Sequence, residues 1–118
     1  MGRRNSKTMD LRAQLSQALE AGQMVQALEL YELIEKQKPD EPRWSHRKGD
    51  LLRRMGRQAD AVRAYERAVE LYSAKGFEAR AIATAKVMLA IDPNRGEVVE
   101  PVEPEAAQRF QQQRRGAG

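Results

Sequence analysis

The stretch GQMVQALELYELIEKQKP, residues 22–39, decides the fold because its pattern returns 34 residues further along the chain. The repeated positions are Gly22 and Gly56, Ala27 and Ala61, Tyr31 and Tyr65, and Glu32 and Glu66. Small residues at fixed places let two helices approach closely, and an aromatic ring between them fills the remaining gap. A period of this length, with a glycine between two helical stretches, is typical of an array of helix–turn–helix repeats.

Glycines, prolines and helical spacing of apolar residues divide the chain into five expected helices. The expected helices cover residues 8–21, 23–38, 42–55, 58–75 and 77–91. The sequence therefore predicts an all-α domain at 8–93, made of one unit at 8–39, a second at 42–75 and an extra helix at 77–91. The fourth helix either closes the second unit or opens a third, since Gly76, Ala81 and Pro93 are spaced like Gly22, Ala27 and Pro39.

Both ends of the chain differ in composition from the helical part. Residues 1–7, MGRRNSK, are basic and are expected to form a disordered arm. Residues 94–118 are expected to form a flexible tail whose first part is acidic and rich in proline and valine. The tail either folds back onto the fifth helix through its valines or is a linker from a longer protein.

The repeated positions resemble those of the tetratricopeptide repeat (TPR) family. The second unit carries the family positions Gly49, Leu52, Gly56, Ala61, Tyr65 and Ala68, and the first carries Leu15, Ala18, Gly22, Ala27, Tyr31, Ile34 and Pro39. The second unit departs from the pattern at Ser73, where proline is usual. The segment around the fifth helix is also similar to TPR segments of some multidomain bacterial regulators. The resemblance implies a helical array that binds other proteins.

The amino-acid composition narrows the class of protein but does not identify a partner. The chain has 118 residues, no cysteine and a net charge of +4, and arginines outnumber lysines by 15 to 6. Arginine presents a planar fork of donors to carboxylates and phosphates, so acidic partners are favoured, although a GC-rich bacterial genome would give the same composition. No apolar run reaches the length of about 18 residues needed to span a membrane. We expect a cytoplasmic protein.

The sequence contains no motif that indicates catalysis. There is no phosphate-binding glycine loop, no dinucleotide-binding turn and no nucleophile elbow. His46 and Asp50 lie one helical turn apart, but two ligands are too few for a metal site without help from elsewhere. We therefore expect no enzyme activity, no cofactor and no metal.

The resemblance implies a ligand-binding groove lined by the first helix of each unit. Two of the implied residues, Arg63 and Arg67, belong to it only if the fourth helix opens a third unit. The candidate groove residues are Arg12, Ser16, Arg43, His46, Arg47, Asp50, Arg53, Arg63 and Arg67. Such a groove would prefer acidic or carboxylate-bearing segments; the alternative is a solvated charged surface.

The fifth helix is apolar on almost every side, which is unusual at the end of a repeat array. Either it is deeply buried, or one side binds a partner or a second copy. The candidate docking face consists of Phe77, Ile82, Met88 and Leu89.

Three functions remain open from the sequence. The first is a protein-interaction module, an adapter or scaffold that binds an acidic or extended segment of a partner. The second is nucleic-acid binding through the basic third helix; the modest net charge of +4, the few aromatic residues and the interleaved acidic residues argue against it. The third is self-assembly through the fifth helix.

Overall fold

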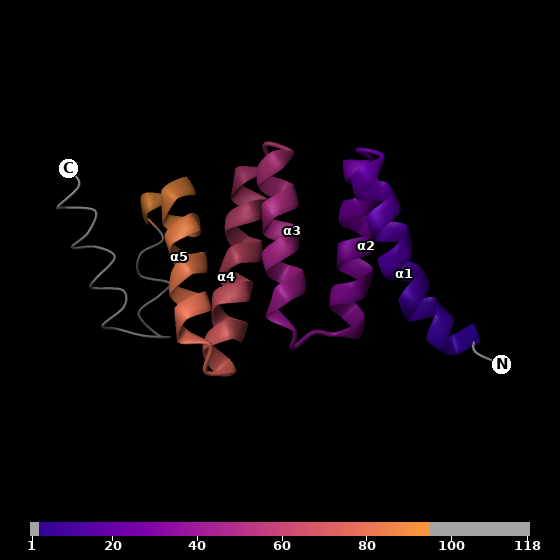
Figure 1. Ribbon diagram of the computed structural model, residues 1–118. Helices are drawn as coiled ribbons and strands as arrows, with labels where there is room; N and C mark the ends of the chain where they lie inside the picture. Colours follow the sequence, from indigo (N-terminus) through magenta and orange to yellow (C-terminus); the bar gives the residue numbers. More distant parts are fainter. Residues whose placement is uncertain (1–2, 95–118) are drawn as a thin grey trace.

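The protein is described by a computed structural model that covers residues 3–94, with side chains placed from Asp10 onward. Successive helices run in alternating directions and follow one another in chain order along the length of the molecule (Figure 1). The helices are α1 (Arg3–Glu20), α2 (Met24–Gln37), α3 (Pro42–Arg54), α4 (Gln58–Ala74) and α5 (Glu78–Ile91). No strand occurs between residues 3 and 94. The predicted all-α fold is confirmed.

Three glycines make the turns between antiparallel helices. Gly22, Gly56 and Gly76 have φ angles of 72°, 79° and 79°, in the left-handed region that other residues rarely adopt. At each turn the residue after the glycine donates its backbone N–H to a carbonyl five positions earlier, as in Gln23 to Ala18 at 2.8 Å. This bond satisfies a carbonyl that the end of the helix leaves without a partner. The recurring glycines therefore set the direction of each following helix.

The core follows the repeated positions. Ala27, Ala61 and Tyr65 are fully buried, as their recurrence in the sequence predicts. A Cβ atom added to Gly49 of α3 would lie only 2.8 Å from the ring of Tyr65, so this glycine lets α3 and α4 approach closely. Burial of an aromatic ring against a backbone without a side chain gives dense packing between these two helices.

The position of α4 answers the question that the sequence left open. It packs against both α3 and α5, as α2 packs against both α1 and α3, so α4 holds the place in the second pair that α2 holds in the first. Thus α4 completes a pair with α3 and provides the surface on which α5 rests.

At the ends of the array, the structure differs from one expectation and describes only the first residue of the expected tail. The basic arm was expected to occupy residues 1–7, but α1 begins at Arg3, so residues 3–7 continue the helix. No glycine or proline separates Arg3 from Thr8, so nothing in the backbone stops the helix there. At the other end, Asn94 donates its backbone N–H to Asp92 Oδ1 at 3.1 Å. The remainder of the predicted tail, 95–118, lies outside the described residues.

The predicted docking face of α5 is also wrong in part. Met88 is fully buried and Leu89 is 5% exposed, because both side chains belong to the core. Ile82 is partly buried against the same core, and only Phe77, 47% exposed, is open to solvent. The apolar character of α5 is thus explained mainly by burial within the array.

Among residues 3–94, no helix combines the length and the apolar character that crossing a lipid bilayer requires.

Candidate functional site

A hollow of about 420 Å³ lies where α3, α4 and α5 meet. We call it the arginine groove. Its lining residues are Arg43, His46, Arg47, Asp50, Tyr72 and Arg80. The structure therefore brings together four residues that the sequence predicted for one site and adds two that it did not.

The missed residue Arg80 could have been found from the repeat period. Arg12, His46 and Arg80 follow one another at intervals of 34 residues, one on each of α1, α3 and α5. Extending the period by one further step thus identifies α5 as the helix that corresponds to α1 and α3. Tyr72 carries no such signal, since it comes from α4 and reaches the groove through packing.

His46 links the three helices around the groove. Its Nδ1 lies 3.0 Å from the Tyr72 hydroxyl of α4 and 3.5 Å from Oγ1 of Thr84 on α5. Its ring meets the rings of Tyr65 and Tyr72 edge to face, each with a centroid distance of 5.9 Å. A polar side chain held from several sides keeps one geometry, so the floor of the groove is formed before any ligand binds.

Among the described residues, Asp50 is the one carboxylate that lines the arginine groove, and it already has a strong partner. Tyr65 donates its hydroxyl to Asp50 Oδ1 at 2.6 Å. Burial raises the pKa of Tyr65 well above its usual range, and the hydrogen bond to Asp50 raises it further, while Arg53 acts in the opposite direction. Tyr65 therefore remains a donor at neutral pH, and one oxygen of Asp50 stays occupied.

Three arginines gather around the ring of Trp44 beside the groove. The guanidinium carbons of Arg12, Arg43 and Arg47 lie 5.4, 5.9 and 5.6 Å from its centroid. Such contacts contribute about 0.5–1 kcal/mol each at exposed sites and leave the N–H donors at the guanidinium edge available. Trp44 is 4% exposed, and its indole Nε1 has no hydrogen-bond partner among the described residues. Arg12 thus lies next to the predicted site, although it does not line the hollow itself.

Two other predicted residues contribute less. Ser16 on α1 and Arg53 on α3 are exposed, and neither lines the arginine groove.

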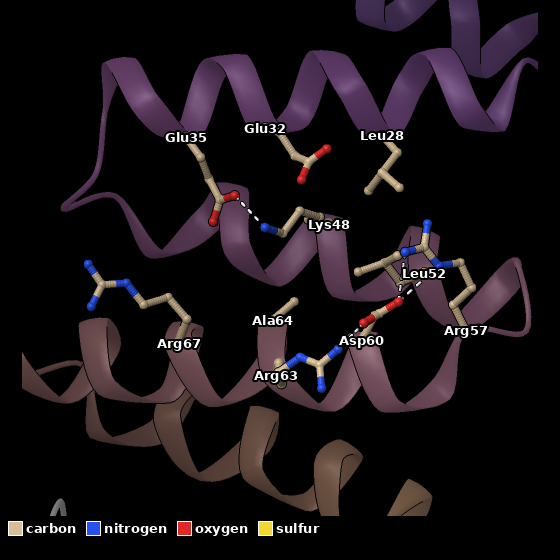
Figure 2. A pocket seen from close by; sticks show the side chains of 10 residues that line it. All are labelled: Leu28, Glu32, Glu35, Lys48, Leu52, Arg57, Asp60, Arg63, Ala64 and Arg67. Atoms are coloured by element: carbon tan, nitrogen blue, oxygen red, sulfur yellow. Dashed lines mark hydrogen bonds and ion pairs between the residues drawn. The ribbon is translucent and has the colours of Figure 1, made fainter.

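Arg63 and Arg67 lie in a different place from the one predicted. They line a cleft of about 230 Å³ between α2 and α4, with α3 beneath it (Figure 2). We call this the α2–α4 cleft; its lining residues are Leu28, Glu32, Glu35, Lys48, Leu52, Arg57, Asp60, Arg63, Ala64 and Arg67. The prediction that Arg63 and Arg67 join the groove is wrong, because α4 belongs to the second pair of helices and does not open a third.

Ion pairs hold most of the charges in the α2–α4 cleft. Lys48 Nζ lies 2.6 Å from Glu35 Oε1, and Arg57 lies 2.7 Å from Asp60 Oδ2 (Figure 2). Arg63 pairs with the other oxygen of Asp60. The hydrogen bond from Arg57, assisted by the charge of Arg63, lowers the pKa of the Asp60 carboxyl.

Within the part of the chain whose side chains are described, no three histidine or carboxylate residues cluster in a way that could hold a metal ion.

No protein-family model matches this chain, and no curated protein matches it.

Proposed function

We propose that this chain is a non-catalytic protein-interaction module, a TPR-like adapter, that binds an acidic, extended segment of a partner in the arginine groove. The observation that carries the proposal is the excess of cations in this hollow. Arg43, Arg47 and Arg80 line it with a single carboxylate, Asp50, which Tyr65 already engages. A role in a bacterial, cytoplasmic regulatory or assembly complex is part of the same proposal.

The groove arginines have donors available for a ligand. Among the described residues, Arg47 and Arg80 have no carboxylate within 4.0 Å, and the one ion pair of Arg43 is with Glu41 at 3.9 Å. A guanidinium binds a carboxylate through two parallel N–H donors, which fixes the orientation of the ligand. The groove therefore favours carboxylate side chains over neutral ones.

Affinity in such a groove depends on several contacts acting together. An exposed arginine–carboxylate contact contributes about 0.2–1 kcal/mol, so one glutamate gives little binding. A segment whose carboxylates reach arginines on both α3 and α5 gains several contacts at once. The fixed arrangement around His46 lowers the entropic cost of ordering these side chains.

The test is a calorimetric titration with a soluble peptide of alternating glutamate and serine, with a lysine–serine peptide as the negative probe. We expect Arg47→Glu/Arg80→Glu to weaken binding of the acidic peptide by about tenfold or more, which corresponds to about 1.4 kcal/mol. The matched control is Arg63→Glu/Arg67→Glu, which makes the same change of charge in the α2–α4 cleft and should leave the affinity within about twofold. Equal losses in the two variants would show that overall charge, and not the groove, determines binding.

Nucleic-acid binding is the second candidate, because the same three arginines that fit carboxylates also fit phosphates. A single-stranded RNA oligonucleotide in the same titration distinguishes the two. RNA binding that is tighter than peptide binding and falls steeply with salt would replace the proposed function.

A further inference from the structure

We propose that the acidic segment EVVEPVEPE, residues 97–105 of this chain, binds in the arginine groove and competes there with the partner. This inference rests on the proposed function, because it assigns an internal competitor to the same groove. The segment lies beyond the described residues. Its binding is inferred from the charge of the groove, from the sequence of the segment and from the length of chain between them.

Charge complementarity is the first observation. The segment contains four glutamates and no cation, while the groove presents three arginines and one occupied carboxylate. Arg12, beside Trp44, adds a further cation at the edge of the groove. Opposite charges on two parts of one chain attract most strongly when salt is low, so occupancy should depend on ionic strength.

The spacing of the glutamates is the second observation. Glu97, Glu100 and Glu103 recur at every third position, and the neighbouring prolines 101 and 104 favour an extended conformation. A polyproline II helix has three residues per turn and rises about 3.1 Å per residue, so these three carboxylates would share one edge at intervals of about 9 Å. A row of carboxylates on one edge suits a groove whose arginines come from the separate helices α3 and α5.

The third observation is the length of chain available between the end of α5 and the groove. Arg80 lies in the first turn of α5, and the helix ends at Ile91. With a rise of about 1.5 Å per residue, the end of the helix lies about 16 Å from the level of Arg80. An extended chain covers this distance with about five residues and crosses the width of a helix with about three more. Eight residues beyond Ile91 end at residue 99, so the part of the segment from Val99 onward is far enough along the chain to reach the groove.

A short connection makes even weak contacts effective. Two sites joined by a short flexible linker meet at an effective concentration in the millimolar range. Because the segment occupies the groove part of the time, it raises the apparent dissociation constant of any external ligand but does not prevent that ligand from binding. A partner with more or better placed carboxylates displaces the segment, so the chain sets a threshold for binding.

The experiment uses the full chain and the glutamate–serine peptide. The test variant replaces the four segment carboxylates and is Glu97→Gln/Glu100→Gln/Glu103→Gln/Glu105→Gln. A control with the same loss of charge on the helices is Glu20→Gln/Glu29→Gln/Glu32→Gln/Glu70→Gln. We expect the test variant to bind the peptide about three- to tenfold more tightly than the control variant does, and we expect this gain to disappear when Arg47→Glu/Arg80→Glu is added.

Peptide affinities that are equal in the test and control variants would overturn the inference. If Arg47→Glu/Arg80→Glu still weakened binding of the peptide, the proposed function would stand without an internal competitor. If the peptide did not bind any variant, the proposed function would fail, and the inference would be decided by the arginine Nε–Hε resonances of the full chain. A change at Arg47 and Arg80 between wild type and test variant, absent in the control variant, would support binding of the segment; unchanged resonances would overturn it.

Discussion

The arginine groove and the α2–α4 cleft contain similar residues but differ in how their charges are paired. In the cleft, Lys48 is bound to Glu35, and both Arg57 and Arg63 are bound to Asp60. In the groove, the arginines lie against aromatic rings instead, as Arg47 does at Trp44 and Arg80 at Phe77, where its guanidinium is 5.7 Å from the centroid. An arginine paired with a carboxylate has its donors occupied, while one on an aromatic face keeps them for a ligand.

Under the proposed function, the number of arginines in a hollow is a poor guide to whether the hollow binds a ligand. The cleft has four cations among its lining residues and the groove has three, yet the cleft also holds three carboxylates. Ion pairs within the cleft stabilise its own walls, although each exposed pair contributes little. Under the proposed function, the partner of each cation therefore decides which hollow can bind an external ligand.

The largest effect should come from removing the close approach of α3 and α4, on which both hollows depend. Gly49→Val places a side chain where the Tyr65 ring already lies, since a Cβ atom there would be 2.8 Å away. Overpacking of this kind costs about 1–3 kcal/mol of unfolding free energy. Chemical denaturation measures the loss, and Ala59→Val on the exposed side of α4 is the control, with an expected change of at most about 0.5 kcal/mol. Equal losses in the two variants would contradict the packing of α3 on α4.

A smaller effect should follow from removing the hydroxyl that holds the groove carboxylate. Tyr65→Phe deletes the hydrogen bond to Asp50 and leaves the ring in place. Because Asp50 is partly exposed and water can replace the donor, we expect a loss of about 0.5–1.5 kcal/mol in unfolding free energy. The freed carboxylate should also weaken binding of the acidic peptide. Tyr31 is also a buried residue, but its hydroxyl makes no side-chain hydrogen bond to Asp50, so Tyr31→Phe is the control and should leave peptide affinity unchanged.

Alkaline pH should destabilise the fold through its three tyrosines, which lie on the side of the arginine groove. Burial raises the pKa of Tyr31, Tyr65 and Tyr72 above the usual value of 10.0. A raised pKa in the folded state means that the contribution to stability is complete below pH 10 and is lost as pH rises through the folded values. Ultraviolet absorbance, followed with near-ultraviolet circular dichroism, should show tyrosine ionisation delayed until structure is lost. Ionisation of all three near pH 10 in the intact fold would contradict this arrangement.

The smallest effect is expected in the cleft. The pKa of Asp60 is lowered by Arg57 and Arg63, so its contribution to stability is present above the usual carboxyl pKa of 3.8 and is lost as pH falls through the lower folded value. Asp60→Asn should therefore remove a small, salt-sensitive contribution at neutral pH and leave stability in strong acid unchanged. Thermal melts at low and high salt measure it. A loss that is independent of salt would show that Asp60 acts through packing.

Most of the fold could be predicted from the sequence, because the turn glycines act locally. Gly22, Gly56 and Gly76 each adopt the left-handed conformation that few other residues tolerate, so their positions alone mark the turns. The start of α1 was missed because no residue near Thr8 prevents the helix from extending to Arg3.

The site was harder to predict than the fold, because it depends on which helices become neighbours. Arg43, His46, Arg47 and Asp50 lie together since they share one face of α3. Arg63 and Arg67 were misplaced because two spacings in the sequence compete. The 34-residue interval from His46 to Arg80 pairs α4 with α3, whereas the match of Gly76, Ala81 and Pro93 to Gly22, Ala27 and Pro39 pairs it with α5. The burial of Met88 and Leu89 depends on the packing of α5 against the array, which an apolar sequence allows but does not demonstrate.

The most direct test of the central claim is nuclear magnetic resonance of the full chain during titration with the glutamate–serine peptide. Arginine Nε–Hε resonances report each guanidinium separately, and the chain's single tryptophan, Trp44, provides an indole signal beside the groove. The account predicts shifts at Arg43, Arg47, Arg80 and Trp44, with Arg57 and Arg63 unchanged. Shifts of similar size in the groove and the α2–α4 cleft, or shifts in the cleft alone, would contradict it.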